Sequence, residues 1–221
     1  MRLLISALTK FILGLALVGA MLFLPAWTLD YFGAWLFLGV LFVPMLLMGS
    51  LLLLKAPSLL QKRLDGKEKQ VAQRGVVALS GLMFPAGFIV SALDFRYSRS
   101  VVPTWCMIGA AVLFLLGYAL YAEVMRENAY LSRTVKVEDG QRVIDTGLYA
   151  VVRHPMYLAT LLMFLPIPLI LGSLWGLVPF ALYPFLIVVR ILDEEKLLTA
   201  ELAGYAEYKA RVRYRLIPFI F

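Results

Sequence analysis

The sequence between residues 147 and 157 reads GLYAVVRHPMY. It contains the single histidine of the chain, His154, between Arg153 and Pro155 at the start of a long apolar region. Proline lacks a backbone N–H group and has a fixed φ angle, so Pro155 favours the first turn of a helix and disfavours helical geometry at His154. Arg153 and His154 would then lie at a helix N-terminus, where free N–H groups and the helix dipole favour an anion. The stretch therefore predicts an anion-binding pocket at a membrane surface, or else a basic residue that merely flanks a membrane span.

The composition of the chain is that of an integral membrane protein. Of its 221 residues, 62% are hydrophobic and 16% are charged, and the mean hydropathy is +0.86. These values exclude an ordinary soluble domain. The net charge of +7 comes mostly from basic residues between apolar runs, which is typical of a cytoplasmic membrane face and not of a nucleic-acid-binding protein. One cysteine and one histidine argue against a disulfide framework, zinc or haem, so we expect no metal site.

Apolar runs on both sides of this stretch predict the fold class. Four of them precede it, ending near residue 27 and covering about 34–54, 75–95 and 102–125, and each is long enough to cross a bilayer. After it, residues 156–192 are apolar but broken near Gly172 and Ser173, which predicts a helical hairpin of two spans. We therefore expect an all-α integral membrane protein of about six transmembrane helices, the last two a hairpin, with a cytoplasmic C-terminal helical tail.

The basic residues predict the orientation in the membrane. Six spans place both termini on one side, together with the polar segments 55–74, 126–153 and 193–221. Because basic residues concentrate in these segments, the positive-inside rule makes them cytoplasmic. We expect one membrane domain over residues 1–221, with four N-terminal spans in 1–125 and a ligand-binding half in 126–221.

A second group of charged residues ends the last predicted span. Arg190 and Glu194 are four residues apart and share a helix face, and Glu195 follows directly. A charge at the membrane boundary is costly and is usually paired or functional, although a snorkelling arginine with an i,i+4 partner is an equal alternative. Beyond a helix stop at Gly204, residues 205–212 have the spacing of a short amphipathic helix for interfacial anchoring.

These features together predict a pocket for a zwitterionic ligand with a flat ring. The pocket would combine an anion-binding helix start, carboxylates opposite it, and the aromatic rings of Tyr149 and Tyr157. S-adenosylmethionine fits such a pocket, because its carboxylate needs donors, its ammonium or ribose needs a carboxylate, and its adenine needs a stacking surface. NADPH or a nucleotide fits nearly as well on these grounds.

An ordered set of motifs over about residues 123–221 resembles a known superfamily. The set consists of GLY at 147–149 with RHPMY at 153–157, Arg190 with Glu194 and Glu195, GYAEY at 204–208, and Ile217-Pro218. It is similar to the isoprenylcysteine carboxyl methyltransferase and phospholipid methyltransferase superfamily of membrane enzymes. The N-terminal four spans contain no motif that we can match.

The resemblance implies S-adenosylmethionine as the cofactor, held on the cytosolic side by the C-terminal half. The implied cofactor-binding residues are Gln141, Arg142, Val143, Ile144, Tyr149, Arg153, His154, Pro155, Met156, Tyr157 and Glu194. Arg190 corresponds to the arginine that faces the substrate, and the implied catalytic residues are Arg190, Glu194 and Glu195. The cation would orient a carboxylate acceptor, whereas a glutamate would take the proton of an amine acceptor.

The resemblance thus implies a membrane-embedded methyltransferase. Its acceptor would be lipophilic, either the carboxylate of a prenylated or other lipid-like substrate or the amine of a phospholipid, and would enter from the membrane lipid. Two alternatives remain from the residues alone. One is an NADPH-dependent membrane reductase related to the sterol reductases, and the other is a non-catalytic membrane protein that binds a ligand.

Overall fold

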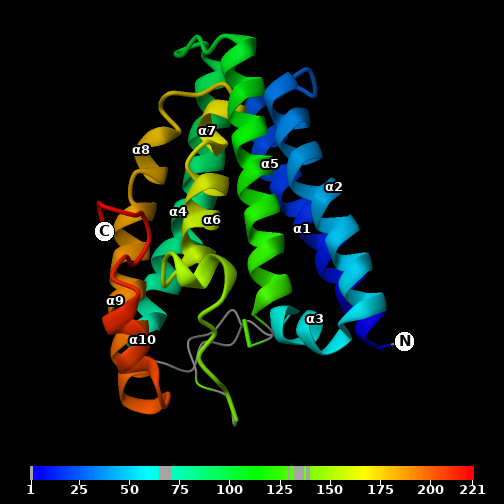
Figure 1. The fold of residues 1–221 in the computed structure, drawn as a ribbon. Coiled ribbons are helices and arrows are strands. Elements are labelled where there is room, and N and C mark those ends of the chain that lie inside the picture. The colour runs from blue at the N-terminus through cyan, green and yellow to red at the C-terminus, as the bar shows by residue number, and fades with distance from the viewer. Residues whose placement is uncertain (1, 65–70, 129, 132–136, 138–139) are drawn as a thin grey trace.

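The computed structural model of the chain describes residues 2–64, 71–128, 130–131, 137 and 140–221. Within these ranges the regular elements are all helices, which confirms the predicted all-helical class (Figure 1). They are α1 (Arg2–Ala26), α2 (Phe32–Lys55), α3 (Pro57–Leu64), α4 (Val71–Arg96), α5 (Thr104–Glu127), the 3₁₀ helix η1 (Gly147–Ala150), α6 (Pro155–Phe164), α7 (Ile167–Ile170), α8 (Leu177–Phe180), α9 (Tyr183–Glu201) and α10 (Tyr205–Arg211).

Four of these helices, α1, α2, α4 and α5, are long and apolar enough to cross a membrane. They run along the long dimension of the molecule and coincide with the four predicted N-terminal spans (Figure 1). Large apolar side chains such as Leu13, Leu24 and Leu82 are more than half exposed on their outer faces. Exposing such side chains to water is unfavourable, whereas exposing them to lipid is not, so the chain is an integral membrane protein.

The last apolar region folds back on itself as predicted, but prolines divide both arms of the hairpin. One arm consists of α6 and α7, and the other of α8 and α9, with α6 against α9 and α7 against α8. Pro166 lies between α6 and α7, and Pro184 lies in the first turn of α9. Pro166 removes a donor that would continue the helical ladder of α6, and Pro184 suits the first turn of a new helix, which accounts for the breaks. Because neither arm is one uninterrupted apolar helix, the count of six spans stays a prediction.

The hairpin packs closely against the long helices. A Cβ atom on Gly117 of α5 would lie 2.9 Å from the backbone nitrogen of Met163 in α6. Only glycine permits this approach, as in other membrane helix pairs with small residues at the contact. The approach leaves the start of α6 beside the end of α5, where the polar segment 126–153 begins.

A buried carboxylate fixes the turn of the hairpin at the other end of the molecule. Asp94 of α4 accepts hydrogen bonds from the hydroxyls of Ser173, at 2.5 Å, and Ser100, at 2.6 Å. The Ser173 hydroxyl in turn accepts from the Gly176 amide at 2.9 Å. These bonds give the two serine hydroxyls and the Oδ2 atom of Asp94 hydrogen-bond partners inside the protein, so Asp94 has a structural role in the turn.

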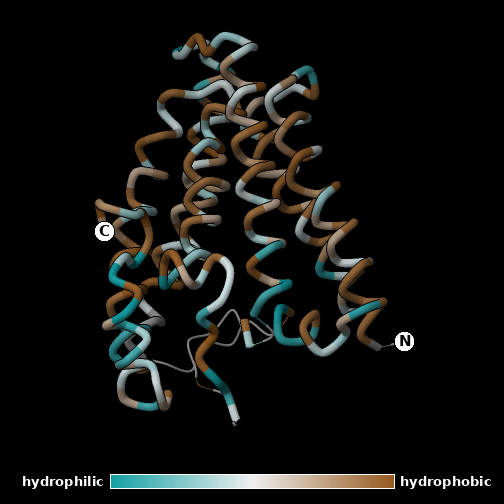
Figure 2. The backbone as a smooth tube through the Cα atoms, in the orientation of Figure 1, coloured by the Kyte–Doolittle hydropathy of each residue, from teal (hydrophilic) through white to brown (hydrophobic). Residues whose placement is uncertain are grey.

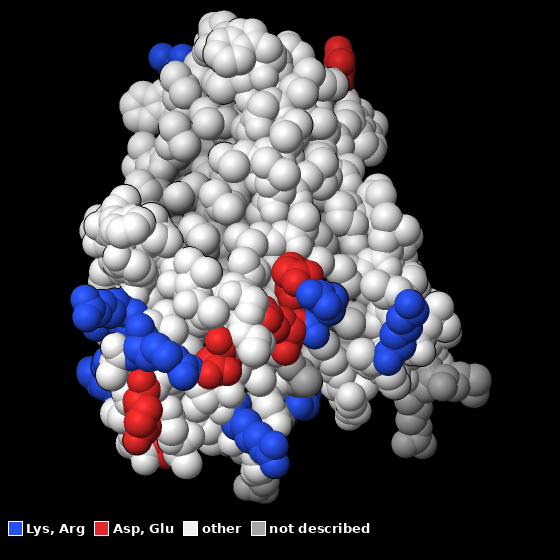
Figure 3. Space-filling model, viewed as in Figure 1, with Lys and Arg blue, Asp and Glu red and all other residues white. Residues whose placement is uncertain are grey.

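Charged and polar residues concentrate at the end of the molecule that contains α3, α10 and the N-terminus (Figures 2 and 3). The middle of the helical layer is hydrophobic, and in this view the opposite end shows few charged side chains. Of the polar segments predicted to be cytoplasmic, residues 65–70, 129, 132–136 and 138–139 lie outside the described residues. The cytoplasmic assignment of the charged end stays a prediction.

Candidate active site

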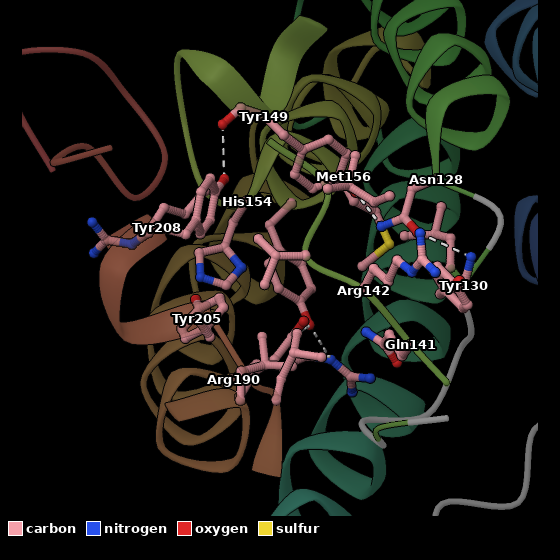
Figure 4. A pocket seen from close by; sticks show the side chains of 18 residues that line it. Asn128, Tyr130, Gln141, Arg142, Tyr149, His154, Met156, Arg190, Tyr205 and Tyr208 are labelled. Atoms are coloured by element: carbon pink, nitrogen blue, oxygen red, sulfur yellow. Dashed lines mark hydrogen bonds between the residues drawn. The ribbon is translucent and has the colours of Figure 1, made fainter. Parts of the chain in front are cut away.

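A pocket opens at the charged end, between η1, the start of α6, the end of α9 and α10 (Figure 4). Its empty volume, the open mouth included, is about 830 Å³. The lining residues are Asn128, Tyr130, Leu131, Gln141, Arg142, Val143, Ile144, Tyr149, Arg153, His154, Met156, Tyr157, Arg190, Glu194, Leu198, Leu202, Tyr205 and Tyr208.

The predicted helix start is present at this pocket. Pro155 is the first residue of α6, and His154 precedes the helix with non-helical geometry, φ −126° and ψ 58°. The amides of Arg153 and His154 donate to the carbonyls of Tyr214, at 3.0 Å, and Arg215, at 2.8 Å. The C-terminal segment therefore fixes the backbone of the motif and directs the His154 ring into the pocket wall (Figure 4).

Glu195 forms the centre of a buried ion cluster behind this wall. Its carboxylate accepts from Arg153 Nε at 2.7 Å and lies 3.3 Å from His154 Nε2, with all three side chains less than 5% exposed. Arg215 Nε at 3.1 Å and Lys209 Nζ at 3.4 Å approach its other oxygen. Burial by itself raises the pKa of the Glu195 carboxyl, but hydrogen bonds and charge from His154 and Arg153 outweigh it and hold the pKa well below its usual value.

Arg190, Tyr157 and Glu194 form a second polar group, which lines the pocket itself. Arg190 Nε donates to the Tyr157 hydroxyl at 2.9 Å, the contact drawn as a dashed line beside Arg190 in Figure 4. The same hydroxyl donates to the Glu194 carboxylate. The predicted shared face of Arg190 and Glu194 is thus confirmed, and a tyrosine that the motif placed two residues after Pro155 connects them.

Tyrosines form much of the remaining wall. Tyr208 donates its hydroxyl to the carbonyl of Tyr149 at 2.8 Å, and Asn128 donates to the Tyr149 hydroxyl at 2.9 Å (Figure 4). Burial, partly offset by the bond from Asn128, raises the pKa of Tyr149 to about 12. Tyr149 is therefore a neutral ring near neutral pH, as a surface for a planar group requires.

Most of the predicted cofactor residues meet at this one pocket. Pro155 is the exception: it is buried at the start of α6 and outside the lining set. Glu195 is also outside the lining set, on the face of α9 that carries the ion cluster. The catalytic role predicted for Glu195 therefore has less geometric support than that of Glu194.

The sequence did not predict several of the lining residues, and it predicted the wrong role for one helix. Residues 205–211 do form the short helix α10, but Tyr205 and Tyr208 are buried against Leu202 and Val143 and line the pocket. Their predicted use as an interfacial anchor is wrong, because apolar spacing alone does not tell a bilayer surface from a protein surface. Asn128, directly after α5, had no sequence signal beyond its place at the end of a span.

The fold and the pocket define an integral membrane protein with a pocket lined by charged residues at one end of its helices. Residues 105–205 match the model of the phospholipid methyltransferase family. This match over the family segment, residues 105–205, agrees with the superfamily resemblance that the motifs of the chain predicted. The matched family is one of methyltransferases, and nothing in the match favours the reductase or the non-catalytic alternative. No curated protein matches the chain.

Proposed function

We propose that this protein transfers the methyl group of S-adenosylmethionine to a lipophilic acceptor that enters from the membrane. One observation supports the proposal above all: the family segment brings a guanidinium, a tyrosine hydroxyl and a carboxylate together in the pocket wall as Arg190, Tyr157 and Glu194. The pocket lies at the end of the membrane helices, where a lipid headgroup and a water-soluble cofactor meet.

The residues of the pocket fit S-adenosylmethionine. Its ammonium and ribose hydroxyls need an acceptor, which Glu194 supplies, and its carboxylate needs a cationic donor, which Arg142 supplies. Its adenine needs a flat surface, which Tyr149, His154 and the α10 tyrosines supply. When bound, the cofactor provides an electrophilic methyl group on a sulfonium.

The chain's own residues have two tasks in such a reaction. The first is to position the acceptor for an in-line displacement, since orientation supplies much of the acceleration. Arg190 binds an anionic or polar group of the acceptor, and Tyr157 holds its guanidinium in place. The second is proton removal when the acceptor is an amine, for which the Glu194 carboxylate is the base within the pocket. A carboxylate acceptor is already nucleophilic and needs only the cation.

We also infer that the pocket faces the cytoplasm, where S-adenosylmethionine is made available to enzymes. The support is the concentration of lysine and arginine at the pocket end of the molecule (Figure 3) and the positive-inside rule.

Two variants test the division of roles. Glu194→Gln should weaken binding of radiolabelled S-adenosylmethionine to the purified protein, whereas Arg190→Ala should leave that affinity within about twofold and abolish methyl transfer to a lipid extract. Asp193→Asn on the same helix, outside the pocket lining, is the matched control and should change neither. Equal loss of cofactor affinity in both test variants would show that the roles are not divided in this way. Binding of NADPH in place of S-adenosylmethionine would refute the proposed function.

A further inference from the structure

A second groove lies on the face of α9 that turns away from the pocket of the candidate active site. Its lining includes Leu192, Glu195, Lys196 and Thr199 of α9, Lys209 of α10, and Arg215 of the C-terminal segment. None of the residues that line this groove also lines the pocket. The C-terminal segment follows α9 back from the charged end of the molecule, which is how it closes one side of the groove (Figure 1). We call this feature the basic groove.

The basic groove carries more positive than negative charge. Lys209 Nζ, at 3.4 Å, and Arg215 Nε, at 3.1 Å, approach the same oxygen of Glu195. Arg153 Nε takes the other oxygen at 2.7 Å from the buried side. Among the described residues, Glu195 is the only acidic partner of Lys209 and Arg215. One carboxylate therefore serves three cations, and the excess positive charge attracts an anion.

The outer face of α9 changes from apolar to basic as it reaches the groove. Phe185, Val189 and Leu192 are exposed on this face at helical spacing. The same face continues with Lys196, whose side chain is 79% exposed and pairs with Asp193 at 3.3 Å. Because an exposed pair of this kind is weak, Lys196 can also serve a ligand in the groove. In a membrane protein such a face contacts acyl chains at its apolar end and headgroups at its basic end.

The C-terminal segment extends this amphipathic surface. Phe219 and Ile220 are more than three-quarters exposed, and the guanidinium carbon of Arg215 lies 5.1 Å from the centre of the Phe221 ring. The segment thus places large apolar side chains beside a cation of the groove. Aromatic and basic side chains together are typical of the membrane–water interface. The basic groove therefore lies at the level of the lipid headgroups.

We propose that the basic groove binds a phospholipid of net negative charge, with its phosphate among Lys196, Lys209 and Arg215 and one acyl chain along the exposed apolar face of α9. The excess positive charge selects an anionic headgroup, because the ammonium of a zwitterionic lipid would be repelled by the same cations. The apolar face selects a lipid over a free anion, which would leave that face unused. The lipid is not the methyl acceptor, since the groove and the pocket lie on different faces of α9. The inference goes beyond the proposed function and does not depend on it.

Native mass spectrometry of the purified full-length protein in non-ionic detergent tests this site, because it counts bound lipids and gives the affinity of the first one. The probes are palmitoyl-oleoyl phosphatidylglycerol, which is anionic, and palmitoyl-oleoyl phosphatidylcholine, which has the same chains and no net charge. Lys209→Gln should weaken phosphatidylglycerol binding about fivefold, the equivalent of about 1 kcal/mol for one cation beside an anionic lipid. It should leave phosphatidylcholine binding unchanged. Arg213→Gln is the matched control and should change neither, because it removes an equal charge from the same segment outside the groove lining.

A purely structural role for Lys209, holding α10 against Glu195, predicts a different pattern. Lys209→Gln would then lower the apparent unfolding temperature and bind phosphatidylglycerol as the wild type does, and this would overturn the proposal. If Lys209→Gln does not fold, Lys196→Gln removes an exposed cation of the groove and should weaken phosphatidylglycerol binding about twofold. Unchanged binding in that variant contradicts the proposal.

A free anion is distinguished from a lipid by its effect on stability. Phosphatidylglycerol should raise the apparent unfolding temperature of the wild type, whereas millimolar inorganic phosphate should not. An equal rise with inorganic phosphate would overturn the assignment of a lipid. None of these measurements uses S-adenosylmethionine or turnover, so a failure of the proposed function would leave their results unchanged.

Discussion

Replacing Glu195 with glutamine tests whether this residue is structural or catalytic. The change removes the carboxylate that faces Arg153 at 2.7 Å, where both side chains are at most 4% exposed. Removing one partner of a buried pair costs about 3–5 kcal/mol. Arg153 keeps hydrogen bonds to the carbonyls of Val212, at 2.6 Å, and Arg213, at 2.9 Å, so we expect the lower end, about 3 kcal/mol. Arg215 and Lys209 add little, because about a third of each side chain is exposed to water.

The assay is the apparent unfolding temperature of the purified protein in one detergent. A loss of about 3 kcal/mol corresponds to a fall of roughly 6–12 °C for a chain of this size. Glu194→Gln is the matched control, because Glu194 is on the same helix and accepts one hydrogen bond, from Tyr157. It should cost about 1 kcal/mol or less in stability. A Glu195→Gln protein with wild-type stability and no methyl transfer would refute the structural reading and restore the predicted catalytic role.

Four further predictions follow from individual contacts. The pKa of Glu195 is lowered in the folded protein. Its contribution to stability is therefore complete above the unfolded pKa of about 4.3 and is lost as the pH falls below that value. The difference in unfolding temperature between wild type and Glu195→Gln should accordingly shrink from about pH 5 toward about pH 3. His154→Ala should weaken S-adenosylmethionine binding about tenfold, the equivalent of about 1.4 kcal/mol, and should destabilise less than Glu195→Gln; unchanged affinity with normal folding would remove His154 from the cofactor site. Gly147→Ala should cost more stability than Gly140→Ala. Both glycines have a positive φ angle, 49° at Gly147 and 71° at Gly140, and this conformation costs an alanine about 1–2 kcal/mol. Only at Gly147 would the new Cβ also lie 2.1 Å from a carboxylate oxygen of Glu127. Single cysteines at Lys55 and Lys209 should react with an impermeant reagent only after cells are opened, whereas one at Ser98 should react in intact cells; the reverse pattern would invert the topology.

The sequence determined the helical membrane fold, for a physical reason that is local. Apolar runs such as 34–54 are long enough to span a bilayer, and in lipid a helix is the simplest way for one segment to satisfy its own backbone hydrogen bonds. A local property of proline also predicted the start of α6 at Pro155, because proline fixes φ and disfavours helical geometry at His154. Helical spacing also placed Arg190 and Glu194 on one face.

Only the tertiary structure distinguished Glu194 from its neighbour Glu195. The two carboxylates are adjacent in sequence and equivalent by charge and propensity, but one turns toward the pocket and the other toward Arg153. Which way each points depends on how the C-terminal segment packs against the start of α6, through contacts more than 50 residues apart such as Arg153 with Val212. The same is true of Arg63, whose approach to Tyr121 follows from the packing of α3 against the end of α5. Such long-range contacts leave no periodic signal in the sequence, because they depend on the relative placement of whole helices rather than on the spacing of residues within one.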